Sequence, residues 1–178
     1  MKHFLRELDK IKKMILSLGA LVEQRVNQIK QAIEDRTVDH AKKIIHLDHE
    51  IDEMEVEIEE ECLKIIALHQ PVATDLRFLI AVIKINNDLE RIGDQVVNIA
   101  QRVVSIAKHP VAPYQFDYSV MADKAEGMLR MSLDSLVNQD LDLAIKVLQL
   151  DDEVDSIKDE AYDNIKKAIA DGVTEDIG

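Results

Sequence analysis

The sequence predicts an all-α protein of tandem three-helix bundles, the second of them incomplete in this chain. Apolar side chains recur at alternating steps of three and four residues along most of the 178 residues, which is the spacing of helices that pack against one another. Hydrophobic residues make up 47% of the chain but aromatic residues only 3%, which favours packed aliphatic helices over a sheet. An internal repeat sorts these helices into two units.

Five helices are expected from this spacing and from the residues that interrupt it. The first covers about residues 4–33 and the second about 38–68. Pro71 separates the second from the third, at 71–106, because proline disrupts a helix interior. Pro110 and Pro113 mark a linker at 110–117. Two further helices follow at about 118–137 and 141–170, the last stopped by Asp171-Gly172.

Each of the first three helices carries one apolar seam, and these seams are the predicted core. The first seam is Phe4, Leu8, Ile11, Ile15, Leu18, Val22, Val26, Ile29 and Ile33. The second is Ile44, Leu47, Ile51, Met54, Ile58, Cys62 and Ile65. The third is Phe78, Val82, Ile85, Leu89, Ile92, Val96, Ile99, Val103 and Ile106. Cys62, the only cysteine, reads as an ordinary core position and cannot form an internal disulfide.

The repeat becomes visible when the chain is shifted so that Leu47 falls on Leu150. This shift aligns LDHEID at 47–52 with LDDEVD at 150–155 without a gap. Every position of the second seam then falls on an apolar residue of the last helix. Helical periodicity would align the seams but not the three acids, so we infer a duplicated three-helix unit. The units are residues 1–109 and 118–178. The second holds two helices, so we expect either a fragment or a third helix supplied by another chain.

Composition and charge exclude several classes of partner. The formal net charge of −13 argues against nucleic acid or an anionic membrane surface, because both need clustered Lys and Arg. The first thirteen residues are charged throughout, unlike a signal peptide. The longest apolar run, 78–83, is far shorter than the ~20 residues that span a bilayer. We therefore expect a soluble, cytoplasmic protein.

Acidic residues form the candidate site. On the third helix Leu76, Ile80 and Ile83 form an apolar row that continues as Asn87, Glu90 and Asp94. The second helix adds an acidic stripe of Asp48, Asp52, Glu55 and Glu59, and its repeat carries Asp151 and Asp155. Like charges four residues apart destabilise a helix by roughly 0.2–0.5 kcal/mol per pair, and a bound metal would relieve that cost. Oxygen ligands suit Mg²⁺, Ca²⁺ or Mn²⁺, and iron where carboxylates bridge several ions.

Two interpretations of this site stay open. The acids also fit a solvated helix face, which is what most charge runs are. Gly93 lies within the motif, and a glycine inside a helix marks either tight helix packing or a backbone that a ligand approaches. We predict metal ligation by Glu90 and Asp94, with Asp48 and Asp52 contributing from the adjacent helix.

Catalytic motifs are missing from the sequence. No Glu is followed three residues later by His, so the di-iron signature of ferritin-like bundles is absent. Neither a phosphate-binding loop nor HExxH occurs, and His40, His46, His49 and His69 are scattered. We predict no enzyme activity and no organic cofactor. A carboxylate-bridged metalloenzyme, or a phosphotransfer module using His46 or His49, is the alternative from another class.

The third helix also carries a resemblance. Its segment VATDLRFLIAVIKINNDLERIGDQVVNIA resembles the signature helix of the PhoU family, supported by LGALVE at 18–23 and by Leu47-Asp48 and Ile51-Asp52. The resemblance covers essentially the whole chain. It implies two tandem three-helix bundles, a homodimer, and a cytoplasmic regulator of phosphate uptake and phosphate-starvation signalling.

The partners and the site follow from the same resemblance. It implies contacts with the ATPase subunit of the phosphate ABC transporter and with a sensor histidine kinase, whose signalling is held off when phosphate is plentiful. The family's acidic motif, tied to metal clusters in some members, matches Glu90-Arg91-Ile92-Gly93-Asp94, and Asp48 and Asp52 match its neighbouring helix. A second motif expected on a sixth helix lies beyond this sequence. A permease accessory protein without the kinase partner is the alternative.

Overall fold

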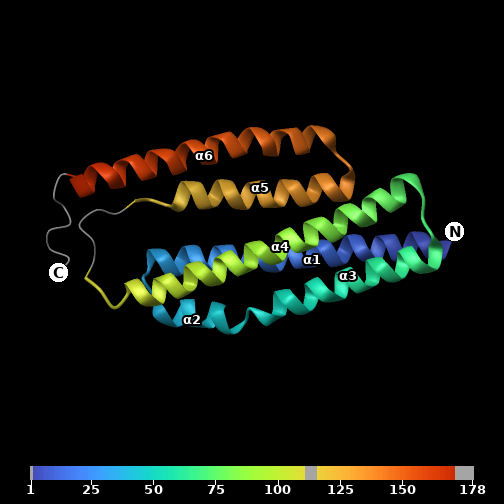
Figure 1. The fold of residues 1–178 in the computed structure, drawn as a ribbon, viewed down its shortest axis with the longest axis horizontal. Helices are drawn as coiled ribbons and strands as arrows, with labels where there is room; N and C mark the ends of the chain where they lie inside the picture. Colours follow the sequence, from blue (N-terminus) through green and yellow to red (C-terminus); the bar gives the residue numbers. More distant parts are fainter. Residues whose placement is uncertain (1, 111–115, 171–178) are drawn as a thin grey trace.

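A computed structural model describes residues 2–110 and 116–170, and these residues form six helices (Figure 1). Their bounds are α1 Lys2–Glu34, α2 Val38–His46, α3 His49–His69, α4 Ala73–Ile106, α5 Ser119–Asn138 and α6 Leu141–Ala170. In the first bundle α1, α3 and α4 pack together, and α2 packs on α1 and α4. The second unit places α5 against α1 and α6 against α5. The all-α prediction is confirmed. The proposed linker 110–117 and the stop at Asp171-Gly172 fall largely outside the described residues.

The prediction of one continuous helix over 38–68 is wrong, because the chain breaks between α2 and α3. At the break the amides of Glu50 and Ile51 bond to carbonyls three residues back, those of Leu47 and Asp48. The carbonyl of His46 thereby loses its helical donor, and the Nδ1 of His49 lies 3.2 Å from it. The repeat segment Leu150-Asp151-Asp152 lies inside the unbroken α6, so the shared LDxExD pattern does not itself cause the break.

The break divides the core of the first bundle into two clusters. The larger cluster joins α1, α3 and α4 through residues such as Ile15, Ile58 and Leu89. The smaller cluster joins the second half of α1 to α2 and the second half of α4, and it comprises Ile29, Ala32, Ala41, Ile44, Val96 and Ala100. Both Ile44 of α2 and Ile51 of α3 are buried. The change of direction between the two helices therefore lets each bury its own apolar face.

The seam of α4 is displaced from the predicted one over its second half. Phe78, Val82, Leu89 and Val96 are buried as expected, but Ile99 and Ile106 are exposed. The positions that complete the buried face are instead the small or polar residues Asn86, Gly93 and Ala100. Side chains of this size allow α2 and α3 to approach α4 closely. Each of these buried positions lies one residue after the isoleucine that the seam predicted, at 85, 92 and 99.

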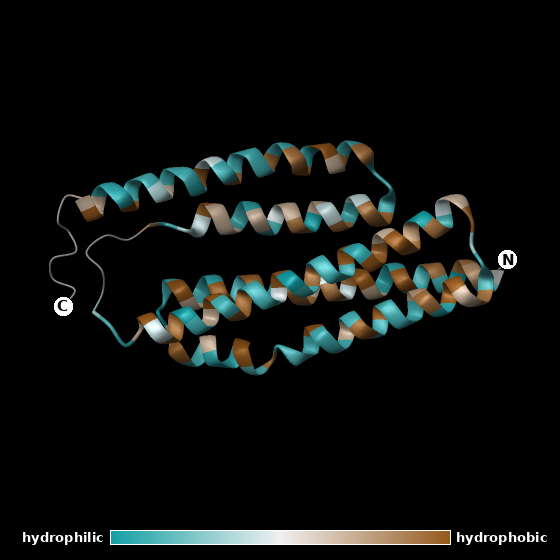
Figure 2. Cartoon of the chain, viewed as in Figure 1, coloured by the Kyte–Doolittle hydropathy of each residue, from teal (hydrophilic) through white to brown (hydrophobic). Residues whose placement is uncertain are grey.

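The second unit is attached to the first through α1. Leu133 of α5 is buried and belongs to the larger core cluster. Two ion pairs lie further along the same interface, Arg130 with Glu23 and Lys30 with Asp123. The start of α6 has exposed apolar side chains at Leu141, Ile145 and Leu148, and Figure 2 shows this brown start giving way to a largely hydrophilic middle before an apolar last turn. Among the described residues, no helix has the length and hydropathy needed to cross a bilayer.

Candidate functional site

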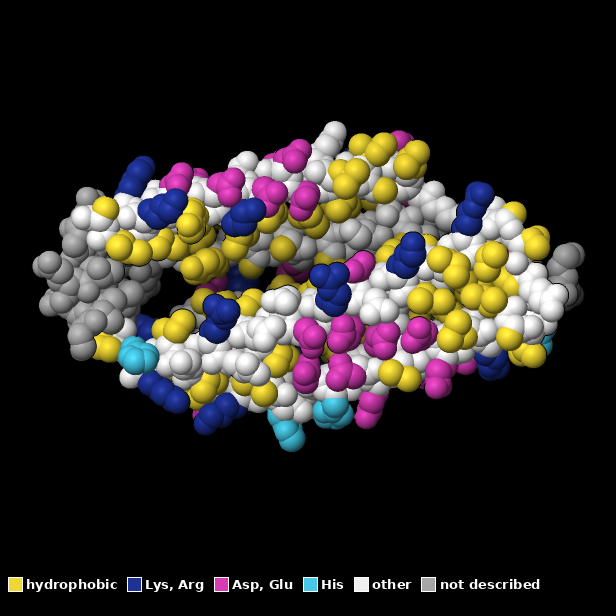
Figure 3. Space-filling view, viewed as in Figure 1, with side chains coloured by type: hydrophobic (Ala, Val, Ile, Leu, Met, Phe, Trp, Pro, Cys, Tyr) yellow, Lys and Arg dark blue, Asp and Glu magenta, His cyan; other side chains and the backbone are white. Residues whose placement is uncertain are grey.

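The predicted site residues lie on α4 and on the adjoining start of α3. Glu90 and Asp94 lie one turn apart on α4, while Asp48 is the residue before α3 and Asp52 lies in its first turn. Asp52 and Asp94 are exposed, and Asp48 and Glu90 are half-buried. Figure 3 shows a patch of Asp and Glu side chains over α3 and α4. We call Asp48, Asp52, Glu55, Glu90 and Asp94 the acidic cluster.

The carboxylates of the acidic cluster influence one another. Partial burial raises the pKa of Glu90, and the charges of Asp94, Asp52, Glu55 and Asp48 raise it further. Burial likewise raises the pKa of Asp48, with added repulsion from Asp52 and Asp94. The pKa of Glu55 rises for the same two reasons, through Glu59 and Asp52. The structure thus brings the four predicted residues into one electrostatic unit, and Glu55 belongs to it as well.

Nearby basic side chains are directed to other acids. Arg25 of α1, which is 4% exposed, pairs with Glu50 of α3 and donates to Gln28. Arg91 lies between Glu90 and Asp94 in sequence but pairs with Asp88. Within the described residues no Lys or Arg forms an ion pair with any member of the acidic cluster. The negative charge of the cluster is therefore left uncompensated by the fold.

The geometry of the cluster is open. Its carboxylates do not form a set of three whose ligand atoms all lie within 4.8 Å of one another in the described part of the chain. Such spreading is expected of like charges without a cation between them. The donors are all carboxylate oxygens, which suit a hard divalent cation, and the side chains would have to turn inward to coordinate one. The residues fit such an ion in chemistry and charge.

Gly93 is explained by helix packing. A Cβ built at this position would lie 2.8 Å from the Cδ1 of Ile51 and 3.3 Å from its Cγ2. Glycine at 93 therefore lets α3 approach α4 at the level of the acidic motif. Asn87 is exposed, whereas its neighbour Asn86 is fully buried and donates to the carbonyl of Glu55 at 2.8 Å. Of the two adjacent asparagines, Asn86 is therefore the one that contacts α3, while Asn87 of the polar stripe is exposed.

The repeated acids of the second unit do not join the cluster. Asp151 and Asp155 are exposed on α6. Asp155 pairs with Lys158 at 2.6 Å, and the charge of Asp151 also acts on that lysine. The two copies of the LDxExD pattern therefore have different surroundings, one facing α4 and the other facing a lysine of its own helix.

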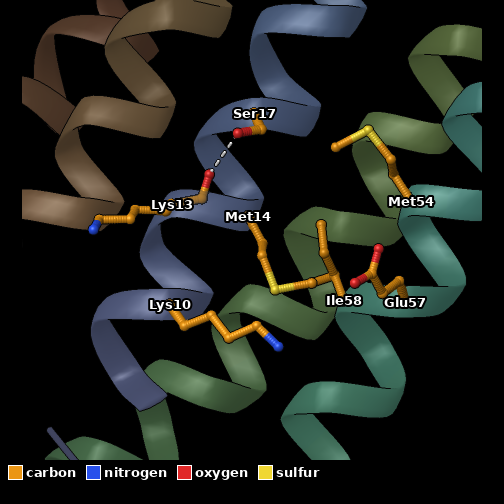
Figure 4. A pocket seen from close by; sticks show the side chains of 7 residues that line it. All are labelled: Lys10, Lys13, Met14, Ser17, Met54, Glu57 and Ile58. Carbon is orange, nitrogen blue, oxygen red and sulfur yellow. Dashed lines mark hydrogen bonds between the residues drawn. The ribbon is translucent and has the colours of Figure 1, made fainter. Parts of the chain in front are cut away.

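A shallow hollow lies between α1 and α3, with a volume of about 250 Å³. It is lined by Lys10, Lys13, Met14, Ser17, Met54, Glu57 and Ile58 (Figure 4). The hydroxyl of Ser17 donates to the carbonyl of Lys13 at 2.9 Å, and Lys10 pairs with Glu61 at 3.1 Å. These polar groups already have partners, and none of the predicted site residues lines the hollow.

Comparison with known proteins identifies relatives along the whole chain. The PhoU domain model matches residues 15–103 and 118–177. A protein of Aquifex aeolicus named phosphate-specific transport system accessory protein PhoU homolog is 35% identical over 99% of this chain and 77% of its own length. A Pseudomonas putida protein with the same name is 35% identical over 86% of this chain, which spans 60% of that protein.

Solved structures agree with the fold. The crystal structure of PhoU from Pseudomonas aeruginosa matches with a TM-score of 0.88 and 32% identity, over 95% of this chain and 82% of that one. A phosphate transport system regulatory protein PhoU from Streptococcus pneumoniae matches with a TM-score of 0.86 and 27% identity, over 94% and 79% of the two chains. The helical bundle, the acidic motif on α4 and these matches together show that the chain belongs to the PhoU family.

Proposed function

We propose that this protein is a regulatory accessory protein of phosphate transport, and that it acts through protein contacts and not through catalysis. One observation carries the proposal. The similarity to the Aquifex aeolicus accessory protein extends over 99% of the chain and so includes both units. A shared fold does not by itself imply a shared function, so the support lies in the sequence identity along both units.

The partners we propose are the ATPase subunit of a phosphate ABC transporter and a sensor histidine kinase. In this proposal the protein works in the cytoplasm as a homodimer and represses phosphate-starvation signalling when phosphate is plentiful. An accessory role at the transporter alone, without the kinase, is the second candidate. The names of the relatives, which mention a phosphate-specific transport system, support the transporter more directly than the kinase.

The surface of α4 supports a contact-based role. Leu76 and Ile80 are 36% and 42% exposed on the same stripe that continues to Glu90 and Asp94. An apolar patch beside a charged one is a common composition for a protein-binding surface. Apolar contacts would supply affinity there, and the acids would select a basic partner.

A pull-down from the source organism at high and low phosphate tests this proposal. The full chain should recover a transporter ATPase subunit, and in the first candidate also a histidine kinase. Ile80→Ser should reduce recovery because it removes apolar contact area, while Leu148→Ser, a matched change on α6, should leave recovery unchanged. Recovery of neither partner by the unmodified chain would overturn the regulatory proposal. Recovery of the ATPase subunit alone would select the second candidate.

We further propose that the acidic cluster binds a hard divalent cation or an iron cluster through Glu90 and Asp94 of α4 and Asp48 and Asp52 of α3. The support is the unfavourable setting of these carboxylates, since partial burial and then repulsion from the neighbouring acids raise the pKa values of Asp48 and Glu90. A cation there would neutralise charge and fix the start of α3 against α4. Its role would be structural, because the cluster contains neither a nucleophile nor a histidine base.

Elemental analysis of purified protein tests the metal site. The double variant Glu90→Gln/Asp94→Asn should lose the bound metal. The matched control is Asp151→Asn/Asp155→Asn, which removes the repeated acids on α6 and should retain it. Equal metal content in all three proteins would contradict ligation by the acidic cluster.

A further inference from the structure

A second group of metal-ligating side chains lies at the opposite end of α3 from the acidic cluster. His3 and Glu7 of α1 meet His69, the last residue of α3. One ligand atom from each lies within 4.8 Å of the other two, and within the described residues this is the only such group of His, Cys, Asp and Glu. Figure 1 shows the start of α1 beside the end of α3.

The three side chains are held there by the backbone and by packing. His3 and Glu7 are four residues apart on α1, so they share one helix face. His69 is fixed by the left-handed cap at Gln70, whose amide donates to the carbonyl of Ile66 at 3.0 Å, and by Pro71 beyond it. The ring of Phe4 lies 5.2 Å from the His69 ring, centroid to centroid. Residues 66 positions apart in sequence (69 − 3) are thereby brought together.

The oxygen at the centre of this group, Oε2 of Glu7, lies within ion-pair distance of both imidazoles. Oε2 of Glu7 is buried from solvent and accepts no well-aligned hydrogen bond from the described residues. Nε2 of His69 lies against it, and Nδ1 of His3 is 3.3 Å away. The charge of Glu7 acts on Lys64, but Lys64 pairs with Glu61 at 2.7 Å. A buried carboxylate oxygen facing two imidazole nitrogens is an arrangement that a cation would satisfy.

We propose that His3, Glu7 and His69 bind a transition-metal ion of the Zn²⁺ class. Two imidazole nitrogens and one carboxylate suit ions of borderline softness, unlike the all-oxygen acidic cluster. Ligand atoms about 2.0–2.1 Å from a tetrahedral Zn²⁺ are roughly 3.4 Å apart. The 3.3 Å between His3 Nδ1 and Glu7 Oε2 is close to that spacing, and His69 would move back from Glu7 to make room for the ion. His3 is exposed, so the fourth position is open to water.

The consequence of binding would be a link between the first turn of α1 and the last turn of α3. This inference does not depend on the proposed role in phosphate transport. It also differs from the proposed hard-cation site in its residues, its ligand chemistry and its place in the fold. Zinc bound here would leave Glu90 and Asp94 free.

Calorimetric titration of tag-free, chelator-treated full chain with Zn²⁺ tests the proposal. We expect one equivalent of Zn²⁺ to bind in a distinct phase of the titration. His69→Gln and His3→Gln should each lower the Zn²⁺ affinity of that phase at least tenfold. His49→Gln, a change of another exposed histidine, should leave this phase unchanged, as should Glu90→Gln/Asp94→Asn. Circular dichroism of each variant checks that it is folded.

Cobalt gives an independent readout. The Co²⁺-loaded protein should show visible absorption of tetrahedral nitrogen and oxygen coordination, and His69→Gln should abolish it. The proposal is overturned if the unmodified chain binds no Zn²⁺, or if both histidine variants bind it as tightly as the unmodified chain does. Loss of the phase in Glu90→Gln/Asp94→Asn alone would assign the zinc to the acidic cluster and would equally overturn it.

Discussion

Gly93 of α4 packs directly against the side chain of Ile51 of α3, and a Cβ at position 93 would lie 2.8 Å from the Ile51 Cδ1. Both residues are buried. The contact lies at the level where Glu90 and Asp94 face Asp48 and Asp52, so the distance between the two helices sets the spacing of the acidic cluster. Of the two roles that the sequence left open for Gly93, helix packing is therefore the one seen here, and it sets the geometry of the site.

Gly93→Ala should destabilise the protein by about 1 kcal/mol. Overpacking a core costs about 1–3 kcal/mol, and replacing a helical glycine by alanine returns up to about 1 kcal/mol. Ile51→Val removes the Cδ1 atom that the new methyl group would meet, so the double variant should recover part of the loss. Urea denaturation of the unmodified protein, the two single variants and the double variant completes a double-mutant cycle, which measures the coupling energy between positions 93 and 51. Additive effects of the two changes would show that the contact does not limit the approach of α3 to α4.

Gly19→Ala should loosen the second unit from the first. Gly19 of α1 lies under Leu133 of α5, and a Cβ there would overlap Cδ1 of Leu133 and lie 3.4 Å from its Cγ. Hydrogen exchange should therefore speed up in α5 more than in α3. Gly127→Ala is the matched control, since a Cβ at that glycine meets no atom within 4 Å. Unchanged exchange in α5 of the Gly19 variant would contradict this packing.

Glu90→Gln should stabilise the metal-free protein by roughly 0.5 kcal/mol, because it removes a half-buried charge and its repulsion from neighbouring acids. A carboxyl whose pKa is raised by folding lowers stability as pH rises through that pKa, so the gain should be present at neutral pH and vanish in acid. Asp88→Asn on the same helix removes an acid that pairs with Arg91 at 3.3 Å and should give no gain. Urea denaturation in the presence of a chelator measures the free energy of unfolding of both variants. If Glu90→Gln were less stable than the unmodified protein, the charge of Glu90 would not be destabilising.

Cys62 should be unreactive in the folded protein. It is fully buried, and desolvation, with the charges of Glu61 and Glu59, raises the pKa of its thiol from 9.0 to about 11. The nucleophilic form of cysteine is the thiolate, so a thiol reagent at pH 8 should label Cys62 only after denaturation. Mass spectrometry of native and urea-treated samples measures the difference. Rapid labelling of the native protein would show that α3 opens readily.

The same thiol gives a pH signature. Between pH 9 and about 11 the unfolded chain loses the Cys62 proton while the folded chain keeps it, so stability falls as pH rises through this window. Cys62→Ala lacks this group and should show a shallower decline when the two proteins are compared by urea denaturation over that range. Identical slopes would contradict a raised thiol pKa.

The helices and most of the core could be predicted from the sequence. The bounds of α6 match the prediction, and the seam of α1 is buried at Ile11, Ile15, Leu18 and Val22. Periodicity succeeds here because a long amphipathic helix must bury one face wherever it packs. The acids of the predicted site were also identified correctly as mutual neighbours, since the motif on α4 and the stripe on α3 lie on adjoining helices.

Three features depended on the tertiary structure. One is the break at Leu47-Asp48, which the repeat of the same pattern in α6 lacks. Another is the burial of Asn86 and Gly93 beside the predicted Ile85 and Ile92. The third is the meeting of His69 with His3 and Glu7. The spacing of His3 and Glu7 is visible in the sequence, but nothing local indicates that the end of α3 reaches them.

By itself, then, the sequence determined that this protein is a set of amphipathic helices with an acidic motif, because side-chain hydropathy and charge repeat along one chain. Where those helices bend, which of two adjacent residues faces a neighbour and which distant side chains share a site were decided by packing. Each of these depends on the shape of a second helix, such as Ile51 fitting over Gly93, and that shape exists only once the chain has folded.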